Sequence, residues 1–190
     1  MGVIVAANLC AVSLGAINAA HADVDFDPLP DGGAHTYCFG ETHAPNNIVA
    51  ERIHWSEGTL ENQTAVTTDF HGAGCTDQSD VRWQQRSIDG YADGWADCLN
   101  YNDNGRCDQF RVRIDYGLIQ DYADSPPAEV RHATCHELGH TASASHYGQG
   151  IANPDAPGHS CMRSGLWDGG EEWTKSYGRH HINFHFNRHF

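Results

Sequence analysis

Four histidines, one glutamate and one cysteine are concentrated in HATCHELGHTASASHYG, residues 132–148. The stretch HELGH has the pattern HExxH, and on a helix its two histidines lie on one face, so that both imidazoles can reach one ion. Imidazole nitrogen suits Zn²⁺, and a glutamate beside the first histidine can take a proton from a water that the metal activates. The segment therefore predicts a zinc centre with His136 and His140 as ligands and Glu137 as general base. The alternative is a solvated helix face in a histidine-rich chain.

A catalytic zinc site needs three protein ligands and an open position for water. His146 lies six residues after His140, a spacing that does not stay on the same helical face. It reaches the metal only if the chain turns away after about Ser143. His146 is therefore one candidate for the third ligand, and the reserve candidates are Asp155, His159, Glu171 and Glu172.

The helix that carries the motif has a recognisable start at Ser125-Pro126-Pro127, because serine caps free N–H groups and proline suits the first turn. After Ser143 the chain is rich in Gly, Pro, Asn and Asp to about residue 170, which predicts an irregular segment. A terminal helix is expected over residues 173–190.

The chain before this helix contains several short strand patterns and one helical pattern. Apolar residues between 44 and 61 recur at helical spacing, and residues 110–116 alternate between apolar and polar. The other expected strands are 35–39, 65–70, 80–84 and 91–99. This order predicts one domain of the α+β class, a mixed α/β sandwich with few helices.

The first 22 residues contain no Asp, Glu, Lys or Arg and end in Ala20-His21-Ala22. An apolar run before a small-x-small triplet is typical of a signal peptide. An uncleaved membrane anchor is the less favoured alternative, because the run is short and rich in Ala and Gly. We therefore expect a signal peptide over residues 1–22, a single domain over residues 23–190 and a secreted, extracellular protein.

The net charge of the chain argues against nucleic acid and anionic membranes as binding partners. The chain has 25 acidic and 11 basic side chains, which gives a formal net charge of −14. Binding to nucleic acid or to anionic membranes needs clusters of Lys and Arg. We therefore expect neither as a partner once the signal has been removed.

The motif, taken with its third histidine, resembles that of a known group of enzymes. HELGHTASASH, residues 136–146, is similar to the metzincin pattern HExxHxxGxxH, with Ser143 where the pattern has glycine. The resemblance implies that His136, His140 and His146 are the three zinc ligands. In that clan the glycine makes a sharp turn, often with positive φ, which costs serine more than glycine. The clan also has a Met-turn, in which a methionine lies under the zinc ligands. Met162, the one methionine after residue 22, is the candidate.

The resemblance, to small secreted enzymes of the snapalysin and matrixin sort, implies both a fold and an activity. The implied fold is a twisted, mostly parallel sheet with a long active-site helix, a Met-turn and a C-terminal helix. The implied activity is that of a secreted zinc endopeptidase, a monomer with one catalytic Zn²⁺, acting on protein or peptide substrates. The alternative is a non-catalytic, disulfide-stabilised metal-binding or interaction domain on a peptidase scaffold. A third class is a zinc hydrolase of a non-peptide amide or ester.

Six cysteines follow residue 22, and an even count in an exported chain indicates three disulfides with fifteen possible pairings. Cys135 precedes a proposed ligand and Cys161 precedes the proposed Met-turn residue, so a Cys135–Cys161 bridge would fasten the site helix to the turn beneath it. A free or differently paired Cys135 is the alternative. Two further bridges are expected, Cys98–Cys107 across a hairpin tip and Cys38–Cys75.

Two further features are candidates for a lesser role. The C-terminal histidines have a spacing that could bind metal, although surface histidines are the simpler interpretation: His180, His181, His185 and His189. Tyr177 is a candidate to assist an oxyanion.

Overall fold

The computed structural model describes residues 25–90, 92–146 and 160–190, so the expected signal peptide lies outside the described residues. Five strands form one sheet in the order β2-β1-β3-β5-β4. Only the β4–β5 pair is antiparallel, and the other neighbours are parallel. The strands are β1 (His35–Phe39), β2 (Thr68–Ala73), β3 (Val81–Gln85), β4 (Gly94–Tyr101) and β5 (Cys107–Ile114). The expected mixed α/β class is therefore confirmed.

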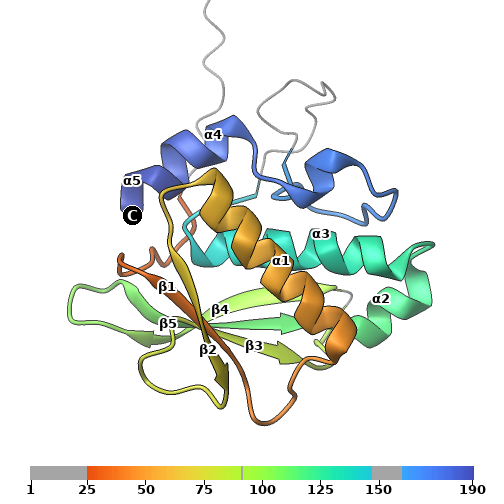
Figure 1. The fold of residues 1–190 in the computed structure, drawn as a ribbon, viewed down its shortest axis with the longest axis horizontal. Coiled ribbons are helices and arrows are strands. Elements are labelled where there is room, and N and C mark those ends of the chain that lie inside the picture. The colour runs from red at the N-terminus through yellow and green to blue at the C-terminus, as the bar shows by residue number, and fades with distance from the viewer. Residues whose placement is uncertain (1–24, 91, 147–159) are drawn as a thin grey trace, which may run out of the picture.

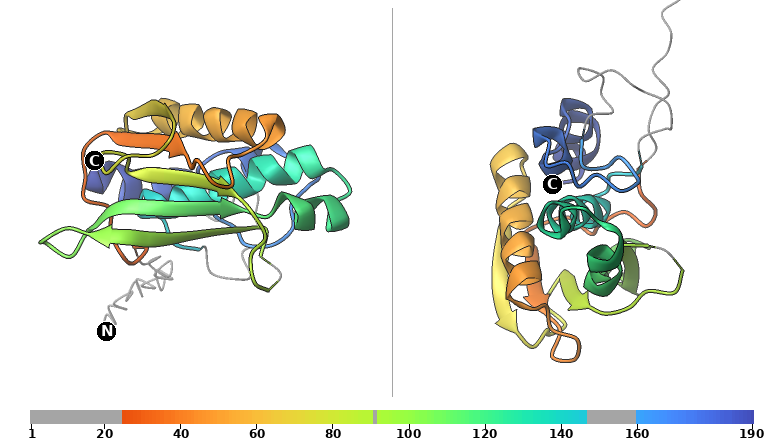
Figure 2. Two further views of the ribbon diagram at one scale, coloured as in Figure 1. Left: turned by 90° about the horizontal axis from the view of Figure 1, so that it is seen from below. Right: turned by 90° about the vertical axis from the view of Figure 1, so that its right-hand side faces the viewer.

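Two long helices lie next to each other on one face of this sheet (Figures 1 and 2). They are α1 (Asn47–Gln63) and α3 (Pro126–Thr141), and the short α2 (Tyr116–Tyr122) precedes α3. The C-terminal segments, drawn in blue, lie on the side of α3 that faces away from the sheet (Figure 2). The helix α3 therefore has the sheet on one side and the C-terminal segments on the other. In the part of the chain that the structure describes, no helix is long and apolar enough to cross a membrane.

The core lies between the sheet and the two helices. Alternate residues of β5, Phe110, Val112 and Ile114, are buried, as the period of a strand requires. Val49 and Ile53 of α1 lie one turn apart and face the same core. The alternation and the helical spacing in the sequence are thus explained by burial against one shared core.

Most element boundaries differ from the expected ones by a few residues, and three expectations were wrong. Strand β5 ends before residue 116, because the Asp115 side chain accepts a hydrogen bond from Leu118 N at 3.0 Å and starts α2. Ser125 is the N-cap of α3, but its side chain makes no capping hydrogen bond. The third error concerns the C-terminal segment.

The expected helix over residues 173–190 is broken into four short pieces. These are η1 (Glu172–Lys175), α4 (Arg179–His181), η2 (Ile182–Phe186) and α5 (Asn187–His189). Between η1 and α4 the chain is extended, because Tyr177 is held at two points: its N–H donates to Gln63 Oε1 at 2.9 Å and its hydroxyl donates to Cys135 O at 2.8 Å. Packing against α1 and α3 thus overrides the helical pattern.

Three disulfides join the expected pairs. Cys38–Cys75 ties β1 to the segment after β2, and Cys98–Cys107 closes the β4–β5 hairpin. Cys135–Cys161 links α3 to the segment that follows the motif. Three disulfides indicate an extracellular or otherwise oxidising environment.

Candidate metal centre

Helix α3 places the HExxH residues inside the protein and not on its surface. His136, Glu137 and His140 are each less than a tenth exposed. The interpretation as a solvated helix face is therefore wrong. Polar side chains buried to this degree need partners or a ligand.

The chain reverses direction at Ser143, as a third ligand at residue 146 requires. Ser143 has a φ of 88°, in the left-handed region, which costs a non-glycine residue about 1–2 kcal/mol. The reversal is stabilised by backbone hydrogen bonds from Ser143 N to His140 O and from Ala144 N to Gly139 O. Serine thus adopts the conformation for which glycine is the ordinary choice.

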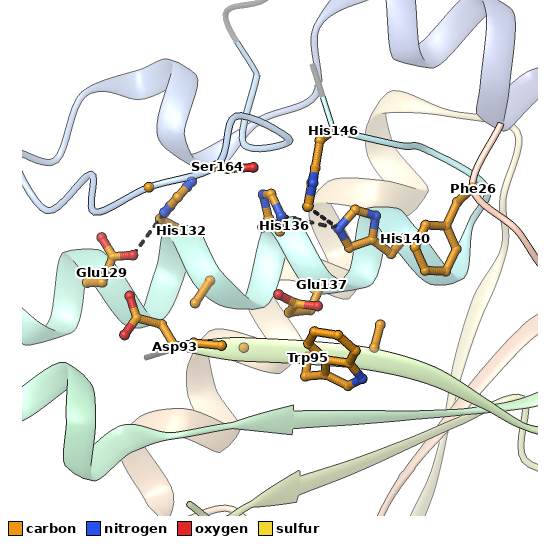
Figure 3. A pocket seen from close by; sticks show the side chains of 15 residues that line it. Phe26, Asp93, Trp95, Glu129, His132, His136, Glu137, His140, His146 and Ser164 are labelled. Carbon is orange, nitrogen blue, oxygen red and sulfur yellow. Dashed lines mark hydrogen bonds and ion pairs between the residues drawn. The ribbon is translucent and has the colours of Figure 1, made fainter. Parts of the chain in front are cut away.

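Three imidazole nitrogens converge beyond this turn (Figure 3). His140 Nε2 lies 3.2 Å from His136 Nε2 and 2.9 Å from His146 Nε2. Zinc–nitrogen bonds of about 2.0–2.1 Å would place tetrahedral ligand atoms about 3.3 Å apart. Among the described residues, His136, His140 and His146 are the one group of three His, Cys, Asp or Glu side chains close enough to hold a metal ion. We call this group the triad.

Backbone carbonyls fix the tautomers of two triad members. His136 Nδ1 lies 2.7 Å from Cys161 O, and His140 Nδ1 lies 2.8 Å from Ala144 O. A carbonyl only accepts, so each Nδ1 carries the hydrogen and each Nε2 presents its lone pair to the triad. Burial, reinforced by neighbouring histidines, holds the pKa of His136 well below its ordinary value. The neutral imidazole is the form that binds a metal.

Met162 forms a floor against the helix between two triad members. Its side chain is fully buried, and a Cβ atom at Gly139 would collide with Met162 Sδ. The turn itself is closed by hydrogen bonds from Met162 N to Ser160 Oγ and from Arg163 N to Ser160 O. Glycine is therefore required at 139 for this turn to approach the helix.

Glu137 lies beside the triad, between α3 and β4 (Figure 3). A Cβ atom added at Gly94 would lie 2.5 Å from Glu137 Cγ, so the carboxylate fits there because residue 94 has no side chain. Burial raises the pKa of Glu137 to about 8, against the lowering effects of the Ala96 N–H and the Arg113 charge. No pattern in the sequence indicates this role of Gly94.

A pocket of about 360 Å³ contains the triad and Glu137. Residues 94–96 of β4 form one wall, and β4 is an edge strand of the sheet. Phe26 closes the pocket beyond His140, on whose ring it stacks with centroids 4.6 Å apart. At the other end lie three residues that the sequence interpretation missed: Asp93, Glu129 and His132.

Several other candidates do not join the site. Asp155 and His159 lie outside the described residues, and Glu171 and Glu172 are exposed and outside the triad. Tyr177 donates its hydroxyl to a core carbonyl and does not line the pocket, which leaves no support for the oxyanion role.

Two of the four C-terminal histidines are buried and do not lie on the surface. His181 and His185 are almost completely buried, and His185 Nδ1 and His189 Nε2 lie 2.8 and 3.3 Å from the Asp25 carboxylate. These contacts fasten the C-terminal segment to the start of the described chain. The expectation of surface histidines was wrong for His181 and His185, because the C-terminal segment lies along α3 (Figure 2).

Comparison of the chain with protein-family models and with curated protein sequences finds no match. The functional assignment therefore depends on the geometry of the triad and its pocket.

Proposed function

We propose that the protein is a secreted zinc endopeptidase of the metzincin type, made with a signal peptide over residues 1–22 and acting as a monomer. The observation that carries the proposal is the convergence of three imidazoles beside a buried glutamate in an open pocket. The turn at Met162 supports it, since it corresponds to the Met-turn of that clan. Ser143, the one departure from the clan's pattern, adopts the conformation that the pattern glycine provides.

The triad fits Zn²⁺ by its chemistry, with three imidazole nitrogens, two of them oriented by carbonyls, and room on the pocket side for a water. The bound ion would supply a Lewis acid that polarises the substrate carbonyl and acidifies water.

Glu137 is the residue that moves the proton. Burial alone would keep it protonated at neutral pH, and a divalent cation at the triad favours its carboxylate form. Its carboxylate takes the proton from the attacking water and gives it to the leaving amine. The edge strand β4 offers unpaired backbone groups to an extended peptide across the pocket.

The test uses the purified, oxidised protein and a diverse peptide mixture, with and without a zinc chelator, and identifies products by mass spectrometry. Chelator-sensitive cleavage is expected. Glu137→Ala should retain zinc and lose about 10²–10⁴-fold in activity, whereas Glu172→Ala, at an exposed position outside the pocket, should match the wild type.

Full activity in Glu137→Ala would refute the mechanism. A folded, zinc-loaded wild type that cleaves no peptide would instead support the non-catalytic metal-binding domain, unless it hydrolyses a non-peptide amide or ester.

A further inference from the structure

The pocket extends beyond the triad along α3 towards the start of the helix (Figure 3). His132 lies one turn before His136, with ring centroids 5.8 Å apart. Glu129 lies almost one further turn away, about 10 Å from His136 along the axis at 1.5 Å per residue. A long side chain next to the cleaved bond would therefore reach this end, which we call the distal end: Asp93, Glu129 and His132.

Glu129 and His132 neutralise each other. His132 Nδ1 lies 3.0 Å from Glu129 Oε1, and its Nε2 lies 3.1 Å from the carbonyl of Arg163. A carbonyl only accepts, so Nε2 carries a hydrogen. The remaining proton lies on Nδ1 or on the carboxyl oxygen, and the pair has zero net charge in both cases. Trp167 N donates to Glu129 Oε2 at 2.8 Å, so both carboxylate oxygens of Glu129 have a hydrogen-bond partner.

The Asp93 carboxylate, in contrast, has no hydrogen bond or ion pair within residues 25–90, 92–146 and 160–190. Burial raises its pKa to about 6, with repulsion from Glu129 and Asp115 adding to this effect and attraction to His132 opposing it, so Asp93 is mostly ionised at neutral pH. Two arginines of neighbouring segments are engaged elsewhere: Arg163 lies over the Trp167 ring at 4.2 Å, and Arg113 pairs with Asp97 at 3.0 Å. Among the described residues that line the pocket there is neither Lys nor Arg.

The pocket lining also includes small residues without polar side chains, among them Ala92, Ala133 and Gly165. An aliphatic stem can pack there, while a cationic group at its end would meet Asp93. We propose that the distal end selects a lysine or arginine side chain adjoining the cleaved bond, and that Asp93 pairs with its charge. This inference rests on the proposed peptidase function and adds the substrate class.

The experiment compares peptides that differ at one atom. N-acetylated, C-amidated peptides carry either arginine or its uncharged isostere citrulline beside the bond that mass spectrometry identifies as cleaved, so that only the side chain brings the charge. The wild type should prefer arginine in kcat/KM by about ten- to a hundredfold, the range for a hydrogen bond to a charged group. Asp93→Asn should bring this ratio close to one. Asp89→Asn, which removes an exposed carboxylate from the same connection, should keep the wild-type ratio.

A second measurement separates the distal end from the catalytic proposal. Fluorescence anisotropy of labelled arginine and citrulline peptides gives their Kd for Glu137→Gln, in which no cleavage interferes. Glu137→Gln should bind the arginine peptide with a lower Kd than the citrulline peptide. This difference should disappear in the double variant Glu137→Gln, Asp93→Asn.

The outcomes are distinct. Arginine-selective binding without cleavage by the wild type would refute the peptidase and keep the role of Asp93. Cleavage without a preference for arginine, or a preference that survives Asp93→Asn, would overturn the inference, as would the absence of both binding and cleavage.

Discussion

The two ends of the pocket contain the same residue type on the same face of one helix, and yet the histidines behave differently. His132, His136 and His140 follow one another at four-residue intervals along α3. His136 and His140 each use Nδ1 on a carbonyl and present Nε2 to the triad. His132 uses both nitrogens, one on Glu129 and one on a carbonyl. The partner of the second nitrogen therefore decides whether a histidine can be a ligand or forms an ion pair.

The carbonyls at the metal end are themselves fixed by tertiary structure. Cys161 is held by its disulfide to Cys135 and by a hydrogen bond from its N–H to Ser176 O at 2.8 Å. Ala144 follows the left-handed Ser143 and pairs with Asp25. Both orienting groups thus come from segments that fold back onto α3.

The largest difference in zinc affinity should lie between a variant that loses a triad histidine and a variant that loses the Glu129–His132 pair. His140→Gln should lower zinc affinity by orders of magnitude, because one of three ligands is lost. The double variant Glu129→Gln, His132→Gln replaces a neutral pair by another neutral pair and should bind one zinc ion. Zinc content is measured by mass spectrometry after dialysis, with circular dichroism to verify folding. A folded double variant without zinc would refute the division between the two ends.

A smaller effect is expected from the wall opposite Glu137. Gly94→Ala puts a methyl group where Glu137 Cγ lies and should reduce kcat/KM about a hundredfold, the cost of a displacement of about 1 Å. Gly58→Ala is the matched control, because a Cβ atom there meets nothing within 4 Å. Equal activity of the two variants would contradict the close approach.

The buried Asp93 carboxylate at the distal end should lower the free energy of unfolding, whereas metal binding at the triad should raise it. The pKa of Asp93 is about 6 in the folded protein against 3.8 ordinarily, so the folded state is penalised above pH 6, and the penalty disappears as the pH falls to about 4. After discounting for partial exposure, Asp93→Asn should stabilise the protein by about 1 kcal/mol at pH 8 and hardly at all at pH 4. Urea unfolding at both pH values measures this, and a gain that is independent of pH would contradict it.

The smallest effect concerns the turn that delivers His146. Ser143→Gly removes the left-handed strain and a buried hydroxyl without a partner in the described part of the chain. Glycine also gains entropy in the unfolded chain, which leaves a net stabilisation of about 0.5–1 kcal/mol. Thermal unfolding without metal tests this, with zinc content expected to be unchanged. A destabilised variant would show that the serine side chain itself supports the turn.

Much of the fold and of the candidate site followed from local pattern. The strand over residues 35–39 and a helix between residues 44 and 61 were predicted because period and burial coincide there. The spacing of HELGH placed His136 and His140 on one face, since helical geometry fixes that relation before any packing. The three disulfide pairs also matched, two of them between residues that the expected elements bring close.

The tertiary structure decided what pattern could not encode. The broken C-terminal segment follows from the contacts of Tyr177 with α1 and α3, and the burial of His185 follows from its contact with Asp25. The approach of Gly94 to Glu137 joins residues 43 positions apart. The unpaired Asp93 gave no local signal, because its state depends on whether Glu129 and Arg113 are already engaged by others. Periodicity reports which face of an element is buried, whereas the partner of each polar atom is chosen only when distant segments meet.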